Sequence, residues 1–83
     1  GGEEFLLVLP GLDREQARVR LDELRRRVAA VVVHDADGRA LQCTASIGFA
    51  CLDAARQTRR ELLALADQRL YQAKREGRDR VIG

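Results

Sequence analysis

At residues 1–11 the sequence reads GGEEFLLVLPG, with two glycines and two glutamates directly ahead of an apolar run. Because Gly1 and Gly2 lack a Cβ, a turn formed there lets the backbone come close to a ligand. The apolar run ends at a proline and a glycine, which predicts a short buried strand. Glu3 and Glu4 offer hard carboxylate oxygens, which Mg²⁺ takes as ligands together with phosphate oxygens. The stretch therefore predicts a metal and phosphate site, although these residues alone fit a solvated β-turn equally well.

Length and composition indicate one small folded domain. The chain has 83 residues, of which 46% are apolar and 34% charged, a composition that argues against disorder. No apolar run approaches the roughly 20 residues that a membrane-spanning helix needs. The sequence shows neither a signal peptide nor an initiator methionine, so we expect it to begin inside a longer protein. We expect that parent protein to work in the cytoplasm, either free or anchored to the membrane.

The charges are unevenly placed along the chain. The net charge is +2, but residues 56–80 hold eight basic and four acidic side chains. A basic segment of this kind fits a phosphate site, a nucleic-acid footprint or a solvated helix face. With one Tyr, two Phe and no Trp, the chain lacks an aromatic stacking platform, so nucleic acid is not an expected partner. Cys43 and Cys51 are expected to be buried and reduced, and His34 is expected to be an exposed loop residue.

Helix signals appear twice in the chain. Asp13 and Gln16 form a capping-box pattern ahead of an amphipathic helix over about residues 13–29. Thr58 and Glu61 repeat the pattern ahead of a second helix over residues 59–75, which Gly77 ends. The arginines of the first helix are expected to form a solvated face. Lys74 and Arg78 are four residues apart across the end of the second helix, close enough to converge on one anion.

Strand signals lie between and after the helices. A short arm at residues 31–33, a turn at 35–38 and a long arm at 40–51 predict a hairpin. On the long arm, larger apolar side chains alternate with a face of small residues that could let a helix or ligand come close. Residues 81–82 predict a final short strand. The expected fold is α+β in the order β-α-β-β-α-β, with an antiparallel-rich sheet and two packed helices.

Four segments of the sequence, in this order, resemble the GGDEF domain, the catalytic domain of bacterial diguanylate cyclases. The signature at residues 1–5 has the GGEEF form, and residues 7–10 match the strand that follows it. Residues 44–50 (TASIGFA) resemble the family's T-x-S-I-G strand. Residues 66–78 (ADQRLYQAKREGR) resemble its A-D-x-x-L-Y-x-A-K-x-x-G-R helix. The resemblance covers essentially the whole chain and implies a partial nucleotidyl-cyclase-like fold.

This resemblance implies an enzyme that joins two GTP molecules into cyclic di-GMP and releases two pyrophosphates, working as a homodimer. Glu3 then corresponds to a ligand of Mg²⁺ or Mn²⁺ that helps to deprotonate the attacking 3′-hydroxyl, and Glu4 to the second acidic metal-binding position. Gly1 and Gly2 correspond to the turn that admits GTP, and Lys74 and Arg78 to the pair that neutralises the triphosphate. The resemblance also implies an upstream sensory or regulatory domain.

The sequence also departs from the family pattern. Residues 1–83 correspond to the C-terminal portion of one GGDEF domain, whose N-terminal half carries a further metal-binding Asp, the guanine-reading residues and the R-x-x-D inhibition motif. We therefore expect the isolated chain to be inactive. Asp79 stands where the family usually has Asn, which places a carboxylate near the phosphate end. An alternative function is a degenerate GGDEF module that binds nucleotide or a protein partner and regulates a neighbouring domain.

Overall fold

The computed structural model describes residue 9, residues 11–52 and residues 58–83. In chain order these form α1 (Arg14–Ala30), β1 (Val33–His34), β2 (Ala40–Leu41), β3 (Ile47–Gly48), α2 (Arg59–Arg75) and β4 (Val81–Ile82). The α+β class is confirmed. The predicted strand over residues 5–9 lies, except for its last residue, outside the described residues.

Both helices begin at the predicted capping residues. Asp13 accepts a hydrogen bond from the N–H of Gln16 at 2.8 Å, and the Gln16 side chain accepts one from the N–H of Asp13 at 3.0 Å. At α2 the Thr58 hydroxyl accepts from the N–H of Glu61 at 3.2 Å. These side chains satisfy backbone donors that have no partner within the first helical turn, which fixes where each helix begins.

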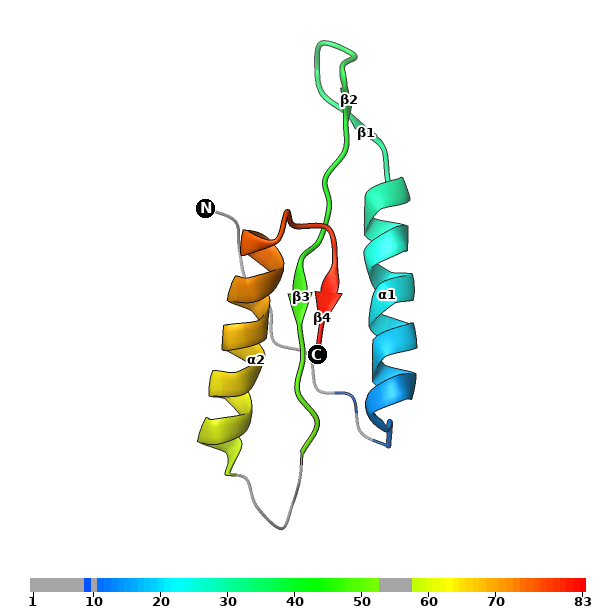
Figure 1. The fold of residues 1–83 in the computed structure, drawn as a ribbon. Coiled ribbons are helices and arrows are strands. Elements are labelled where there is room, and N and C mark those ends of the chain that lie inside the picture. Colours follow the sequence, from blue (N-terminus) through cyan, green and yellow to red (C-terminus); the bar gives the residue numbers. More distant parts are fainter. Residues whose placement is uncertain (1–8, 10, 53–57) are drawn as a thin grey trace.

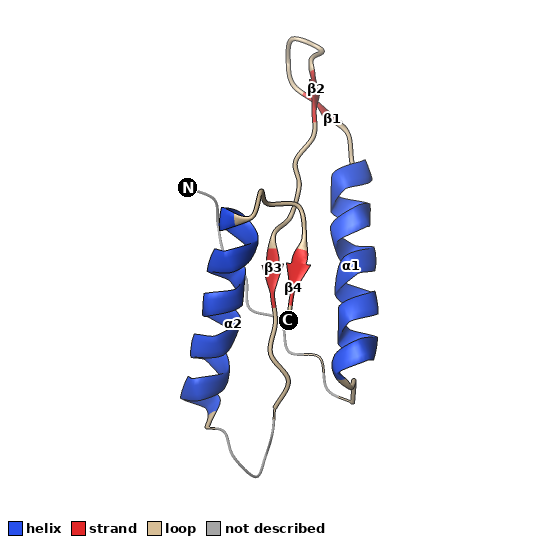
Figure 2. Ribbon diagram, viewed as in Figure 1, coloured by secondary structure: helices blue, strands red, loops and turns tan. Residues whose placement is uncertain are grey.

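The strands among the described residues form two separate two-stranded pairs (Figure 2). β1 and β2 are antiparallel, with Val33 opposite Leu41, so the predicted hairpin is confirmed. β3 and β4 are parallel, with Ile47 opposite Val81, because α2 carries the chain back between them. The long arm predicted over residues 40–51 is not continuous, since residues 42–46 are neither helix nor strand. Among the described pairs, one is thus antiparallel and one parallel.

The two helices cover opposite faces of the β3–β4 pair, while the β1–β2 hairpin projects beyond them (Figure 1). Phe49 is buried on one face together with Ala17 and Leu21 of α1. On the other face Gly48 meets α2, where an added Cβ would lie 2.5 Å from the carbonyl oxygen of Ala66. This close approach confirms the prediction that the small-residue face admits a helix.

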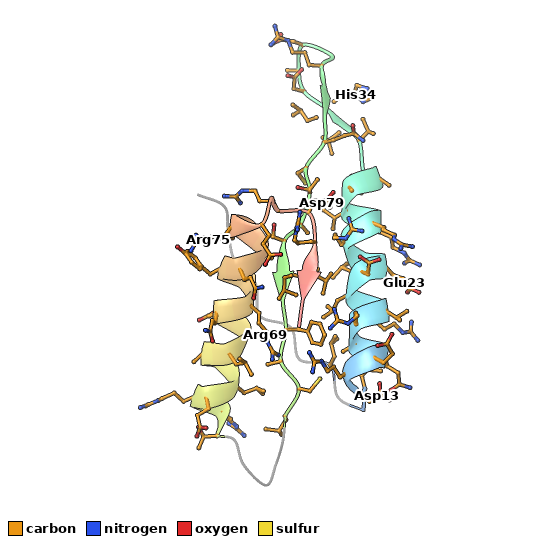
Figure 3. The ribbon with its side chains drawn as sticks, in the orientation of Figure 1. Asp13, Glu23, His34, Arg69, Arg75 and Asp79 are labelled. Carbon is orange, nitrogen blue, oxygen red and sulfur yellow. The ribbon has the colours of Figure 1, made fainter. Side chains whose placement is uncertain are left out.

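The cysteine prediction needs a correction. Both thiols are free, as expected, but Cys43 is exposed and Cys51 is only half-buried against the core. Cys43 lies in the segment between β2 and β3, where the expected alternation of a continuous strand is lost. His34 is exposed as predicted, although it ends β1 and does not lie in a loop (Figure 3).

Candidate functional site

The predicted site residues fall into two groups. Gly1, Gly2, Glu3 and Glu4 lie outside the described residues. Lys74 is half-buried in the last turn of α2, and Arg78 is exposed just beyond the end of that helix. The convergence of Lys74 and Arg78 on one anion therefore stays a prediction. Of the predicted site, the structure describes the C-terminal end of α2, where these two residues lie.

The C-terminus of α2 closes in a Schellman-type motif. The helix is capped at Glu76, and Gly77 follows with φ of 117°. The N–H of Arg78 donates back to the carbonyl oxygen of Ala73 at 2.9 Å, which satisfies an otherwise unpaired helix carbonyl. The predicted termination at Gly77 is thus confirmed. Ala73 is fully buried, so the motif rests on a fixed part of the helix.

The turn after this motif is held in an unusual backbone conformation. Arg78 and Asp79 have φ of 63° and 46°, values in the left-handed region that residues with a Cβ seldom adopt. Such a conformation persists only where the surrounding contacts hold it. The carbonyl of Arg78 accepts from Nε of Arg80 at 3.0 Å, and Val81 then enters β4. We call residues 77–79 the left-handed turn.

Helix α1 supplies the contact that ties down the left-handed turn. Nη1 of Arg25 lies 2.7 Å from Oδ1 of Asp79, and its Nε lies 2.8 Å from Oδ1 of Asp22. Asp79 is seen in Figure 3 between the end of α2 and α1. Hydrogen bonding to Arg25 lowers the pKa of Asp22, and hydrogen bonds to Asp22 and Asp79 raise the pKa of Arg25. Both shifts favour the charged forms of Asp22 and Arg25.

Arg25 is a residue whose role the sequence did not indicate. The three-residue spacing of Asp22 and Arg25 marks an ion pair on one helix face. The contact to Asp79 spans 54 residues and has no signal in the sequence. The same contact shows that Asp79, which stands where the family usually has Asn, has a side-chain partner on α1.

Other arginines of α1 also form hydrogen bonds to residues far away in the sequence. Nη2 of Arg14 and of Arg18 each donate to the carbonyl oxygen of Gly83, at 2.6 Å and 3.2 Å. The Arg18 guanidinium additionally lies 5.5 Å from the centre of the Phe49 ring. The expectation that the α1 arginines form a solvated face is wrong for Arg18 and Arg25, which are half-buried and bond to residues near the far end of the chain. Arg14 is exposed, as expected.

Within residues 11–52 and 58–83 no group of three or more His, Cys, Asp or Glu side chains is arranged to hold a metal ion. In the same part of the chain neither helix is long and apolar enough to cross a bilayer.

Comparison with known proteins shows the family of this chain. The family model described as "Diguanylate cyclase, GGDEF domain" matches residues 1–80, and the chain therefore belongs to this family. It is 40% identical over 98% of its length to the diguanylate cyclase DgcP of Pseudomonas aeruginosa, and 35% identical over 98% to the diguanylate cyclase DosC of Escherichia coli. It is 36% identical over its whole length to the response regulator PleD of Caulobacter vibrioides. The chain spans only 12%, 17% and 18% of these three relatives, respectively.

Proposed function

We propose that this chain is part of a diguanylate cyclase domain, which condenses two GTP molecules into cyclic di-GMP and releases two pyrophosphates. The family match over residues 1–80 carries this proposal. Two of the relatives named above are themselves called diguanylate cyclases. The signature glutamates and the basic residues at the end of α2 are both present in the sequence, which supports the proposal.

Each site residue has a role that suits its chemistry. Glu3 and Glu4 fit Mg²⁺ or Mn²⁺ by their donor atoms, since these ions prefer carboxylate oxygens. When bound, the ion would neutralise charge on the substrate phosphates. Glu3 would also accept the proton of the attacking 3′-hydroxyl. Lys74 and Arg78 would hold the triphosphate of GTP, and Gly1 and Gly2 would let the nucleotide lie against the backbone.

The reaction needs two substrates that face each other, so we propose that two copies of the domain meet as a homodimer. In each copy the protein contributes positioning and fixed positive charge, which supply most of the rate enhancement in phosphoryl chemistry. The 3′-hydroxyl of one GTP attacks the α-phosphate of the other, and pyrophosphate leaves. A second attack, with the roles exchanged, closes the ring.

The test compares two glutamate substitutions in the full protein that carries this chain. Glu3→Ala should lower cyclic di-GMP formation from GTP and Mg²⁺ by at least about a hundredfold, since it removes a metal ligand and a proton acceptor. Glu15→Ala is the matched control, because Glu15 is an exposed carboxylate in the first turn of α1. Product is measured by chromatography and mass spectrometry. Undiminished product from Glu3→Ala would contradict the proposal, and a wild type that binds GTP without turnover would favour the regulatory alternative.

A further inference from the structure

The left-handed turn is held from both of its ends and from one side. Its start is fixed by the hydrogen bond from Arg78 to Ala73 of α2, and its exit by the bond from Arg80 to the Arg78 carbonyl. The third contact is the ion pair of Asp79 with Arg25, which reaches across from α1. Because both Arg78 and Asp79 have positive φ, the turn depends on such contacts to keep its shape.

The ion pair with Asp79 is placed to act as a fixed anchor. The side chain of Arg25 is only 19% exposed, and Asp22 holds its Nε so that the guanidinium presents Nη1 to Asp79. A guanidinium held by two carboxylates has a defined direction, since its N–H groups form a rigid fork. Arg26 also contacts Asp22, at 2.9 Å, but its side chain is 72% exposed. Arg25 and Arg26 thus both contact Asp22, and Arg25 also contacts Asp79 of the left-handed turn.

We propose that Arg25 is a positioning residue for phosphate binding: by holding Asp79, it keeps Arg78 in the orientation in which that side chain meets the substrate triphosphate. This inference rests on the proposed function, in which Arg78 binds phosphate. Arg25 does not itself touch the substrate. A cation fixed in its bound orientation binds more tightly than one on a mobile turn, because less conformational entropy is lost on binding.

The first experiment is a double-mutant cycle in the full protein. Arg78→Ala should raise the KM for GTP about tenfold, and Arg25→Ala should raise it about threefold or more. If Arg25 acts through Arg78, adding Arg25→Ala to Arg78→Ala should change KM by less than about twofold. Arg26→Ala, the matched control, should leave KM within about twofold of wild type. Effects that multiply, or equal effects of Arg25→Ala and Arg26→Ala, would overturn the inference.

A second pair of variants separates positioning from folding. Asp79→Gly removes the carboxylate but tolerates positive φ, so the turn can still form, and KM should rise as in Arg25→Ala. Asp79→Asn keeps an acceptor oxygen in a residue that also tolerates this conformation, and it should restore most of the lost affinity relative to Asp79→Gly. A loss of thermal stability in Asp79→Gly with unchanged KM would show a structural role alone and would contradict the inference.

Binding of inorganic triphosphate, measured by calorimetry, distinguishes failure of this inference from failure of the proposed function. If the wild type makes no cyclic di-GMP yet binds triphosphate with the same dependence on Arg78 and Arg25, the cyclase proposal fails and the positioning role stands. If cyclic di-GMP forms but neither triphosphate binding nor the KM for GTP changes in Arg25→Ala, only the positioning role fails. A wild type that neither makes product nor binds triphosphate would overturn both.

Discussion

Gly48 sets how closely α2 can approach β3. A Cβ on this residue would overlap the backbone N of Leu70 and lie 2.5 Å and 2.6 Å from backbone atoms of Ala66 and Arg69. Backbone atoms cannot swing aside as the end of a flexible side chain can, so the whole helix would have to shift. Gly48 therefore positions α2, and through it the Schellman motif that presents Arg78.

Substituting Gly48 should accordingly be costly. We expect Gly48→Ala to lower the free energy of unfolding by about 2–3 kcal/mol through overpacking. Gly38→Ala is a useful control, because Gly38 has φ of 81° but nothing within 4 Å of an added Cβ. Its backbone strain alone should cost about 1 kcal/mol. Urea unfolding of the full protein measures both, and equal losses for the two variants would show that the contact with α2 is unimportant.

The ion pair of Asp22 with Arg25 predicts a pH dependence. Because the folded-state pKa of Asp22 is lowered below its usual 3.8, its contribution to stability is complete above that pH and is lost as the pH falls through the lowered value. Asp22→Asn should thus be less stable than wild type at pH 7, and the difference should narrow below about pH 4.

Thermal unfolding of the full protein between pH 7 and pH 3 measures this difference. Asp37→Asn is the control, since Asp37 is exposed in the hairpin turn and is remote from the network around Arg25. A stability gap for Asp22→Asn that stays constant down to pH 3 would exclude the ion pair as its cause.

At the scale of elements, local side-chain chemistry made the helices predictable. Asp13 and Thr58 satisfy backbone donors within three residues, so their effect can be seen in a short window of sequence. Gly77 likewise ends α2 because a residue without a Cβ accepts φ of 117° without strain. The final strand was also predicted at the residues where it forms, directly after this motif.

The strand pairing and the side-chain contacts between elements were less predictable, because they depend on residues far apart in the sequence. Residues 42–46 have the alternation typical of a strand but no regular structure, since a strand also needs a partner in register. The parallel pairing of β3 with β4, likewise, joins residues 34 positions apart. Of the candidate site, Lys74 and Arg78 could be named from the sequence, whereas Arg25 could be found only from its distance to Asp79.

The capping box of α1 should stabilise the protein measurably. Asp13→Ala removes the acceptor for Gln16 and should cost about 1 kcal/mol of stability, whereas Asp13→Ser should keep most of it. Arg25 lies near the C-terminal end of α1, far from the capping box. Fraying of the first turn should therefore leave the contacts of Arg25 intact and the KM for GTP unchanged. Chemical denaturation and steady-state kinetics of the full protein test the two statements separately. Equal stabilities for the two variants would contradict the capping role.

At the scale of the whole molecule, the described residues enclose a small core. Four apolar residues are buried (Ala17, Leu21, Phe49 and Ala73). Large apolar side chains on several elements stay exposed, among them Val33 and Leu41 of the hairpin and Tyr71 of α2. The chain also spans only a small share of the relatives to which it is similar. That the chain works within a larger protein stays a prediction.

We accordingly expect no measurable cyclic di-GMP from the isolated 83-residue chain supplied with GTP and Mg²⁺. A site with part of its metal ligands and no guanine-contacting residues would lack both orientation and charge neutralisation. The matched sample is the full protein under the same conditions, with circular dichroism used to confirm that the isolated chain is helical. Robust product from the isolated chain would contradict this expectation.

The stoichiometry of the reaction in the full protein tests the proposed cyclase activity directly. GTP and Mg²⁺ are supplied, and cyclic di-GMP and pyrophosphate are measured in the same samples over time. We expect two pyrophosphates to be released for each cyclic di-GMP formed, and both products to be lost together in Glu3→Ala. GTP that remains bound and unchanged, or pyrophosphate release without cyclic di-GMP, would contradict it.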